Sequence, residues 1–314
     1  MGKLFMNNPN IVVLLGGISG EREVSFKTAH AVINQLKQHF NVRSIQLDDK
    51  TLPEDLIPNN ELIFPLLHGT FGEDGSLQAL LEQRGLAFIG SDSPASRLCM
   101  DKMQSKRLAQ ALGISVLPAI EVIAGQELSP ETLKAQLKCD EFALKPTCEG
   151  SSIGVHLCDN FLDLQQHWKE EKSGHYMIER RVHGRELTVG VLQGEALGVV
   201  EIRPRSGFYD FHNKYTPGAC EYLYPAPIDA TVTNAVRDMA ARFFAGAHCL
   251  DFARADFLLE GEQVFFLEMN TIPGMTDQSL FPKSADCYGL SFDTILQRIV
   301  QGAVQRNQIA KLLK

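Results

Sequence analysis

Three oxygen-bearing side chains near the carboxyl end of the chain, Asp256, Glu268 and Asn270, have the types and spacing of a metal site. Side chains two positions apart on a β-strand point to the same face, so Glu268 and Asn270 share one face of the strand predicted by the run Val264–Met269. The segment Glu260-Gly261-Glu262-Gln263 indicates a hairpin turn, which would place Asp256 opposite Glu268. The pattern therefore predicts that three oxygen ligands converge.

The neighbours of these side chains on both strands are almost all apolar, which would hold two carboxylates close together in a dry place. That arrangement is unfavourable without a cation. Carboxylate and amide oxygens select hard ions, and Mg²⁺ is the expected ion where phosphate oxygens complete the shell. The alternative is a carboxylate pair at the end of a sheet that is solvated or paired with Arg254.

A loop of small residues, Glu149-Gly150-Ser151-Ser152-Ile153-Gly154, lies between two strand-like runs and could cradle a phosphate. Glycine and serine leave backbone N–H groups accessible, and the hydroxyls add further donors. Lys145, just before the loop, and Lys102 could supply positive charge. The loop matches neither the P-loop nor the dinucleotide-binding pattern, and the alternative is a flexible turn flanked by solvated lysines.

Other candidate residues are ambiguous by themselves. Glu21 and Glu23 follow a Gly-Gly turn at the start of a helix, where they could bind a ligand or only complement the helix dipole. Ser279, at a second helix start, is either an N-cap or an anion ligand. His68 and Tyr215 are a turn histidine and a loop tyrosine.

The first third of the chain alternates short apolar runs with amphipathic segments. We expect strands at 11–15, 42–47, 61–67 and 87–89, with helices at 24–38 and 76–84. Such alternation predicts a parallel sheet with helices on both faces. The loops that carry Glu21 and His68 would then lie past the carboxyl ends of the strands, where ligands bind in such sheets.

The rest of the chain has the pattern of helices mixed with antiparallel strands. We expect helices at 93–113, 130–138, 160–171, 230–247, 279–288 and 292–305, with strands at 119–123, 141–145, 155–157, 176–179, 186–192, 196–202, 255–259 and 264–269. The polar stretch Arg203–Glu221 has no apolar period, and loops of that length are usually functional or disordered. We predict three domains, at 1–95, 96–180 and 181–314.

Composition and charge limit the classes of function. A chain of 314 residues with 44% hydrophobic and 22% charged residues is typical of a globular protein of two or three domains. The net charge of −8, without a long Lys/Arg block, argues against nucleic acid or an anionic membrane as the main partner, although a small anionic ligand is compatible. Seven cysteines without a C-x-x-C pair predict free thiols, and the apolar run 11–15 is too short for a membrane span or a signal peptide. We therefore expect a cytoplasmic protein.

Taken together, these stretches resemble the D-alanine–D-alanine ligases of the ATP-grasp superfamily. The motifs that carry the resemblance follow the family's order along most of the chain: Leu15-Gly16-Gly17, Ser19, Glu21-Arg22-Glu23-Val24-Ser25, Leu67-His68-Gly69, Gly72-Glu73-Asp74-Gly75, Met100-Asp101-Lys102, Lys145-Pro146, Glu149-Gly150-Ser151-Ser152, Gly154, Glu179, Glu186, Phe208-Tyr209-Asp210, Lys214-Tyr215, Arg254, Asp256, Glu268, Asn270-Thr271, Pro273-Gly274-Met275-Thr276 and Ser279-Leu280. Their joint occurrence outweighs the alternative stated for each residue alone. The resemblance implies an α/β protein, α+β in its ATP-binding half, with a three-domain ATP-grasp fold and an N-terminal parallel-sheet domain.

The resemblance also implies a reaction: D-Ala + D-Ala + ATP → D-Ala-D-Ala + ADP + phosphate, a step of peptidoglycan precursor synthesis. The carboxylate of the first D-alanine would attack the γ-phosphate to form an acyl phosphate, and the amine of the second would then displace phosphate. ATP would be the co-substrate and Mg²⁺ the metal, in two sites, with Mn²⁺ able to replace it. A homodimer is expected from the family alone.

The same resemblance assigns roles to individual residues. Those implied to bind ATP are Lys102, Lys145 and Lys214 at the phosphates, Glu179 and the Val182 backbone at adenine, and Glu186 at the ribose. Those implied to hold Mg²⁺ are Asp256, Glu268 and Asn270. Those implied to bind substrate or to act in catalysis are Glu21 and His68 at the first ammonium, Ser151 and Tyr215 in a hydrogen-bond chain to Glu21, Arg254 and the Gly274 N–H as an oxyanion hole, and Ser279 and Leu280 at the second carboxylate. The stretch Arg203–Glu221 would be a lid that excludes water.

The sequence departs from the family pattern at a few positions. Thr147-Cys148 replace a serine and a basic residue that are common before Glu149, which puts local lid contacts in doubt. Arg181 and Gln278 stand where an aromatic residue and a histidine occur in some members. The nearest alternative is a D-alanine–D-lactate ligase, which usually lacks the lid tyrosine. The others are a further ATP-grasp carboxylate–amine ligase and a non-catalytic nucleotide-binding module.

Overall fold

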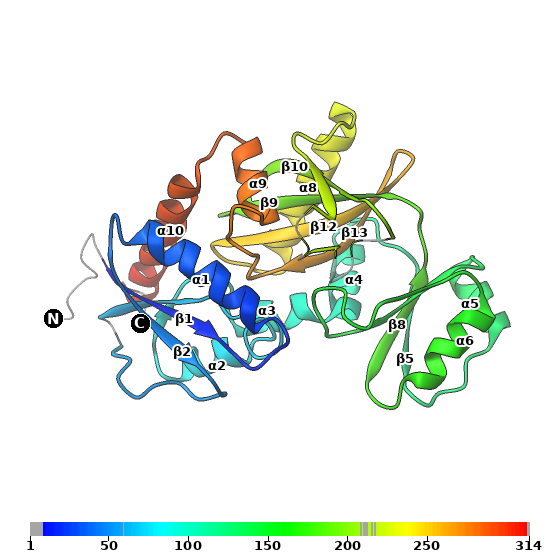
Figure 1. The fold of residues 1–314 in the computed structure, drawn as a ribbon, viewed down its shortest axis with the longest axis horizontal. Coiled ribbons are helices and arrows are strands. Elements are labelled where there is room, and N and C mark those ends of the chain that lie inside the picture. Colours follow the sequence, from blue (N-terminus) through cyan, green and yellow to red (C-terminus); the bar gives the residue numbers. More distant parts are fainter. Residues whose placement is uncertain are drawn as a thin grey trace.

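Three β-sheets form the framework of the protein (Figure 1). The structure is a computed structural model that describes residues 9–58, 60–207, 209, 213–214, 216 and 218–312. In Figure 1 the N-terminal sheet lies at the left, the sheet that contains β5 and β8 lies at the right, and the third sheet lies between them. Among the described residues, none of the helices combines the length and apolarity that a membrane crossing requires.

The N-terminal sheet is parallel throughout, with the strand order β2-β1-β3-β4. Its strands are β1 (Asn10–Gly16), β2 (Asn41–Leu47), β3 (Glu61–Pro65) and β4 (Ala87–Phe88), and its helices are α1 (Arg22–Leu36) and α2 (Ser76–Gln83). The central strand β1 is buried almost completely, as its continuous apolar run requires. The parallel sheet predicted from the alternating pattern is therefore confirmed.

The segment predicted as one helix at 93–113 is two helices. They are α3 (Ser93–Met100) and α4 (Lys102–Ala111). Asp101 separates them because its backbone is extended, with φ −84° and ψ 107°, and its carboxylate accepts hydrogen bonds from the N–H groups of Met103 and Gln104. The single-helix prediction was wrong because an aspartate that caps a new helix interrupts an otherwise continuous apolar pattern.

A second, antiparallel sheet has the strand order β5-β8-β6-β7. Its elements are β5 (Ala119–Ile123), α5 (Pro130–Leu137), β6 (Phe142–Pro146), β7 (His156–Cys158), α6 (Phe161–Glu170) and β8 (His175–Arg180). A separate cluster of buried apolar side chains joins α5 and α6 to the sheet, with Trp168 packed edge-on against Tyr176.

The third sheet is also antiparallel and has the order β11-β10-β9-β12-β13. Its strands are β9 (Arg185–Leu192), β10 (Glu195–Pro204), β11 (Cys220–Leu223), β12 (Phe252–Glu260) and β13 (Gln263–Asn270), and the helices α8 (Ala230–Gly246) and α9 (Leu280–Cys287) pack against it. The polar stretch Arg203–Glu221 is not wholly a loop, because its two ends pair as β10 and β11. The apolar pattern missed this ladder because both ends alternate little and β11 lies at the edge of the sheet.

The last helix, α10 (Phe292–Leu312), returns to the N-terminal sheet, where it lies beside α1 in Figure 1. One apolar cluster contains Ile11 of β1, Val32 of α1 and Ile299 of α10. A second cluster joins Cys99 of α3 to the third sheet. The division of the chain at 1–95, 96–180 and 181–314 stays a prediction, and both clusters combine residues from more than one of these ranges.

Candidate active site

Two adjoining cavities of about 980 Å³ and 430 Å³ contain the candidate residues. The larger cavity lies between the second and third sheets, and the smaller one lies between the N-terminal loops and the end of the third sheet. Residues that line both are Lys102, Glu149, Tyr209, Lys214 and Glu268. Ligands in the two cavities would therefore meet at a wall that carries two lysines and two carboxylates.

The β12–β13 hairpin places the three predicted metal ligands together. Asp256 pairs with Glu268 in the strand register, and Arg254 pairs with Asn270. The strands turn at residues 261–262, between Glu260 and Gln263, as the sequence predicted. A β-bulge follows Asp256, at the point where the hairpin reaches the cavities.

The carboxylate of Asp256 also pairs with Arg254. Arg254 donates from Nε to Oδ1 at 2.9 Å and from Nη2 to Oδ2 at 2.7 Å, and Thr188 Oγ1 donates to Oδ1 at 2.6 Å. Burial would raise the pKa of Asp256, but Arg254 and Thr188 outweigh burial and hold that pKa below its ordinary value. The pairing considered as an alternative to a metal site is thus present in the structure.

The other two ligands have weaker partners. Glu268 Oε2 lies 3.5 Å from Lys102 Nζ, and the Ile272 N–H donates to Asn270 Oδ1 at 2.9 Å. Within the described ranges, no group of three or more His, Cys, Asp or Glu side chains could hold a metal. Two carboxylates and one amide fit Mg²⁺ only if oxygens of a bound ligand complete its six positions, and the shared wall allows phosphate oxygens to do so.

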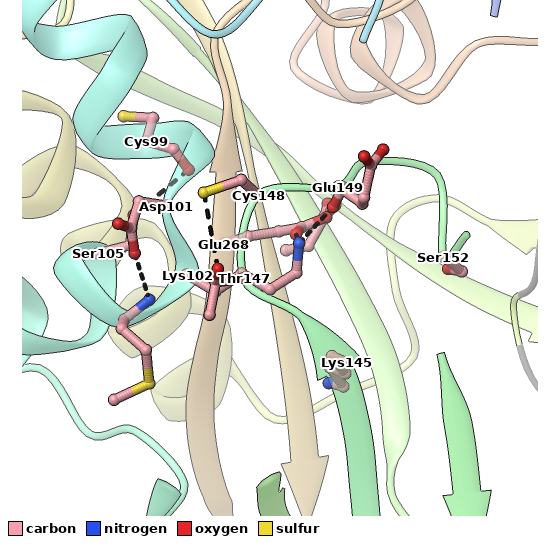
Figure 2. A network of polar contacts seen from close by, with 12 residues as sticks. Cys99, Asp101, Lys102, Ser105, Lys145, Thr147, Cys148, Glu149, Ser152 and Glu268 are labelled. Atoms are coloured by element: carbon pink, nitrogen blue, oxygen red, sulfur yellow. Dashed lines mark hydrogen bonds and ion pairs between the residues drawn. The ribbon is translucent and has the colours of Figure 1, made fainter. Parts of the chain in front are cut away.

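Lys102, at the start of α4, links the small-residue loop to the hairpin (Figure 2). Its backbone N–H donates to the Thr147 carbonyl at 2.9 Å, and its Nζ donates to the Glu149 carbonyl at 2.5 Å. The same Nζ faces Glu268, so one ammonium contacts both the loop and a predicted metal ligand. Lys102 therefore has the position expected of a group that binds phosphate.

Glu179 on β8 lines the larger cavity and is 1% exposed. Its carboxylate forms ion pairs with Lys145 of β6 and with Lys106 of α4, the latter at 2.8 Å. Burial opposes ionisation, but the two lysines lower the pKa of Glu179 to about 2. The sequence analysis missed Lys106, although its place on the buried face of α4, with Met103 and Ala109, was a readable signal.

Glu186 of β9 and Lys214 both line the larger cavity, where their charges interact. Burial raises the pKa of Glu186 to about 7, with Lys214 opposing that shift. Burial lowers the pKa of Lys214, whose ammonium lies 4.9 Å from the centre of the Tyr209 ring. The Tyr209 N–H donates to Glu186 at 3.4 Å, which ties the described part of the Arg203–Glu221 stretch to the cavity.

The N-terminal loops bring Glu21 and His68 into the smaller cavity. Ser151 Oγ donates to the Glu21 carboxylate, which joins the small-residue loop to the start of α1. His68 Nε2 lies 3.2 Å from Thr28 Oγ1, and burial lowers the pKa of His68. Glu23, by contrast, is exposed in the first turn of α1, where it complements the helix dipole.

Glu73 is a second buried carboxylate in the smaller cavity, and it was given no role from the sequence. The Gly69 N–H donates to its Oε2 at 2.6 Å. Burial, together with the nearby Glu21, raises the pKa of Glu73 to about 8. Glu73 belongs to the motif Gly72–Gly75, so its place in that motif was the sequence signal that could have identified it as a site residue.

Ser279 occupies the N-cap position of α9, but its side chain makes no capping hydrogen bond. Its Oγ instead accepts from the Thr276 N–H at 3.0 Å. Ser279 therefore stands at the N-cap position, as one alternative predicted, but its hydroxyl does not cap the helix. A Cβ on Gly274 would lie 2.7 Å from Ser279 Oγ, so a larger residue here would displace that hydroxyl from its present position.

Every predicted site residue in the described part of the chain lines one or both cavities. The smaller cavity has Glu21, His68, Ser151, Arg254, Asn270, Gly274, Ser279 and Leu280; the larger has Lys145, Glu179, Val182, Glu186 and Asp256; both have Lys102, Lys214 and Glu268. Tyr215 lies outside the described residues. The individual roles stay predictions.

Comparison with known proteins shows to which family this chain belongs. Residues 48–91 match the family described as D-ala D-ala ligase N-terminus, and residues 108–301 match the family described as D-ala D-ala ligase C-terminus. The D-alanine–D-alanine ligase of Syntrophotalea carbinolica is 38% identical over 306 residues, which cover 96% of this chain and 98% of the relative. This chain belongs to the D-alanine–D-alanine ligase family.

Solved structures of the D-alanine–D-alanine ligase family have the same fold. The D-alanine–D-alanine ligase from Bacillus anthracis in complex with ATP has a TM-score of 0.82 and 27% identity, over 96% of this chain and 99% of that chain. VanG D-Ala:D-Ser ligase from Enterococcus faecalis has a TM-score of 0.83 and 28% identity, over 95% of this chain and 100% of that chain. The ATP-grasp fold predicted from the sequence is therefore confirmed.

Proposed function

We propose that this member of the D-alanine–D-alanine ligase family joins two D-alanine molecules with cleavage of ATP to ADP and phosphate. The observation that carries the proposal is the shared wall of the two cavities, formed by Lys102, Lys214 and Glu268 among others. A nucleotide in the larger cavity would present its phosphates at this wall. An amino acid in the smaller cavity would reach the same wall from the other side.

In the proposed nucleotide complex, Lys102, Lys145 and Lys214 bind the phosphates because their ammonium groups lie along the larger cavity. Glu179 and the Val182 backbone contact the adenine, and Glu186 contacts the ribose. Asp256, Glu268 and Asn270 would hold Mg²⁺, in two sites, with Mn²⁺ able to replace it. When bound, the metal would neutralise the charge of the phosphates.

In the first proposed step, the carboxylate of one D-alanine attacks the γ-phosphorus of ATP, and ADP leaves. The product is D-alanyl phosphate, whose carbonyl carbon is a better electrophile than that of a free carboxylate. Glu21 binds the ammonium of this D-alanine, and His68, which burial keeps neutral, lies in the same pocket. Ser151 fixes the Glu21 carboxylate, and Tyr215 would extend this hydrogen-bond chain.

In the second proposed step, the amine of the other D-alanine attacks the acyl carbon, and phosphate leaves from the tetrahedral intermediate. Arg254 and the Gly274 N–H stabilise the oxyanion. Ser279 and the N–H of Leu280, at the start of α9, bind the carboxylate of the second D-alanine. The stretch Arg203–Glu221 closes the site, which protects the acyl phosphate from water.

Three further features of the proposal come from the family resemblance and the composition. The protein is a homodimer, it is located in the cytoplasm, and its product enters peptidoglycan synthesis. All seven cysteines are free thiols in the structure, which agrees with a reducing compartment. D-Alanine and ATP are the small-molecule partners, and neither nucleic acid nor a membrane is expected as a partner.

A substrate panel tests the proposed reaction. Purified protein with Mg-ATP should release more ADP with D-alanine alone than with D-alanine plus D-lactate at neutral pH. D-Serine belongs in the panel because a structural neighbour is a D-Ala:D-Ser ligase, and L-alanine and larger amino acids test other carboxylate–amine ligases. Preference for D-lactate, D-serine or an L-amino acid would reassign the substrate. Nucleotide binding without ADP release would indicate a non-catalytic module.

A further inference from the structure

Lys106 is a buried lysine that lines neither cavity. It is 3% exposed, on the face of α4 that packs against the rest of the protein. Its Nζ lies 2.8 Å from Glu179 Oε2 and donates to the Leu117 carbonyl at 3.1 Å. Burying an ammonium is costly unless it is paired, so this lysine must have a partner at this position. Its ion-pair partner, Glu179, does line the nucleotide cavity.

Glu179 has two cationic partners, but only one of them would stay paired with it when a nucleotide is bound. Lys145 lines the cavity and is proposed to bind a phosphate, whereas Lys106 lies behind Glu179 and cannot reach a ligand in either cavity. When Lys145 turns to a phosphate, Lys106 alone keeps Glu179 paired.

The geometry of this pair is that of an ammonium and a carboxylate: Lys106 Nζ lies 2.8 Å from Glu179 Oε2 and donates a second hydrogen bond to the Leu117 carbonyl. Burial lowers the pKa of Lys106, and the ion pair with Glu179 opposes that shift. Burial opposes the ionisation of Glu179, but Lys106 and Lys145 together lower its pKa. An ionised carboxylate only accepts hydrogen bonds, so a ligand must offer Glu179 a donor.

The surroundings of Glu179 suit a flat base. Apolar side chains that line the same cavity include Leu117, Ala143, Met177, Leu187 and Leu267. In an apolar and dry slot, a buried carboxylate that meets another acceptor loses its hydrogen bond and repels the ligand. At the 6-position adenine presents an amino donor, whereas hypoxanthine and guanine present an oxo acceptor. Their nearest donor, N1–H, lies at the next ring position, so a ligand held by its 6-position would not offer it to Glu179. A protonated Glu179 could donate to that 6-oxo group.

We propose that Lys106 is a positioning residue for nucleotide choice: it holds Glu179 as an ionised acceptor, so the cavity selects a 6-amino purine triphosphate over a 6-oxo one. This inference rests on the proposed function, because it takes the larger cavity to be the nucleotide site. It adds a residue outside both cavities to that site. It also gives the two lysines different roles: Lys145 binds the phosphates, and Lys106 acts through Glu179 on recognition of the base.

The test compares ATP with inosine triphosphate (ITP), which differs at the 6-position. Dissociation constants of the Mg²⁺ complexes are measured by calorimetry on the full chain, without amino acid, for wild type, Lys106→Met and Glu179→Gln. We expect wild type to bind ATP at least about tenfold more tightly than ITP. Lys106→Met should reduce this ratio at least about fivefold, because Glu179 then takes up a proton or turns away. Glu179→Gln should reduce it too, since an amide can donate to the 6-oxo group.

Two further variants separate positioning from general damage. In Lys106→Met/Glu179→Gln the ratio should equal that of Glu179→Gln alone, since Lys106 acts through Glu179. Lys134→Met removes an exposed lysine paired with Asp140 and should keep the wild-type ratio. Thermal unfolding of each variant monitors folding, and if Lys106→Met does not fold, Glu179→Gln decides.

The outcomes are distinguishable. An unchanged ATP:ITP ratio in folded Lys106→Met, or in Glu179→Gln when that variant decides, overturns the inference. Equal binding of ATP and ITP by wild type also overturns it, while leaving the proposed function intact. A wild-type protein that binds neither nucleotide would instead contradict the proposed function.

Discussion

Carboxylates of the two cavities have polar or cationic partners. Arg254 holds Asp256 in a two-point contact, Ser151 donates to Glu21, and Glu179 lies between Lys145 and Lys106. Such contacts fix the positions of groups that are costly to bury alone. At the scale of single residues, the site is therefore a set of preorganised charges whose removal should affect specific steps.

Arg254→Ala should lower kcat by roughly 10²–10³, because one donor of an oxyanion hole typically contributes that factor. The predicted role acts on the tetrahedral intermediate, so binding of Mg-ATP should remain measurable by calorimetry, although loss of the pair with Asp256 should weaken it. Arg107→Ala, which removes an exposed arginine paired with Glu121, is the matched control and should keep normal turnover. Normal turnover of Arg254→Ala would show that the oxyanion role is wrong.

Glu73 should make stability depend on pH. Its pKa is about 8 in the folded protein against an ordinary value of 4.5, so between these values the folded state binds a proton that the unfolded state has lost. Stability is therefore complete below the lower value and falls as pH rises towards about 8, by at most about 1.4 kcal/mol per pH unit. Glu73→Gln imitates the protonated form, so it should flatten the decrease in Tm between about pH 5 and about pH 8.

The control for Glu73→Gln is Glu127→Gln, which changes an exposed glutamate in a loop. That variant should keep the wild-type dependence of Tm on pH. If Glu73→Gln and wild type lost the same number of degrees over this range, the carboxyl of Glu73 would already be ionised at neutral pH.

At the scale of elements, the ends of helices and strands carry the site. The loops after β1 and β3 supply Glu21 and His68, the β12–β13 hairpin supplies the predicted metal ligands, and the start of α4 supplies Lys102. The break between α3 and α4 positions that lysine, because Asp101 both ends one helix and caps the next. A continuous helix would direct the Lys102 backbone N–H along the helix and away from the Thr147 carbonyl.

Asp101→Ala should lower the free energy of unfolding by about 1 kcal/mol, the usual cost of a lost N-cap. It should also raise the KM for ATP severalfold, because Lys102 follows the cap directly. Asp229→Ala is the matched control: Asp229 caps α8 through the Thr231 N–H, and it lines neither cavity. The control should lose similar stability in urea and keep its KM, and a parallel KM change in both variants would refute a local role for Asp101.

At the scale of the whole molecule, the end of the chain ties the N-terminal sheet to the third sheet. Arg306 of α10 donates to the Phe88 carbonyl of β4 at 3.0 Å and to Asp251 Oδ2 at 2.7 Å. The same Oδ2 accepts from the Gly90 N–H at 2.7 Å. Asp251 directly precedes β12, so a buried carboxylate joins α10, the N-terminal sheet and the start of the β12–β13 hairpin.

Arg306→Ala should lower the free energy of unfolding by about 2 kcal/mol, since it leaves the Asp251 carboxylate buried without its cation. The cost should be smaller than for a fully buried pair because the Arg306 side chain is 29% exposed. Adding Asp251→Asn should recover part of the loss, because an amide carries no charge and asparagine tolerates the φ of +57° at this position. Urea unfolding of the three proteins measures this coupling, and strictly additive losses would refute it. Arg298→Ala, an exposed pair with Glu195, is the control.

Local periodicity was enough to predict most elements. The alternation in the first third predicted the parallel sheet, and the spacing of Asp256, Glu268 and Asn270 around a two-residue turn predicted the β12–β13 hairpin in its correct register. These features are readable because strand geometry and turn chemistry act over a few residues. The family motifs in order then identified the fold and the reaction class before any contact was known.

Only the tertiary structure decided how those elements meet. It brought Lys106 of α4 to Glu179 of β8, Glu73 to the Gly69 N–H beside Glu21, and α10 back to the first sheet. It also showed that Asp256 pairs with Arg254, which the sequence left open. A residue's pattern states which face is buried, whereas the charge, hydrogen bond or cavity that it meets depends on segments distant in the chain. For that reason the sequence determined the parts of the site, and packing between the three sheets determined their partners.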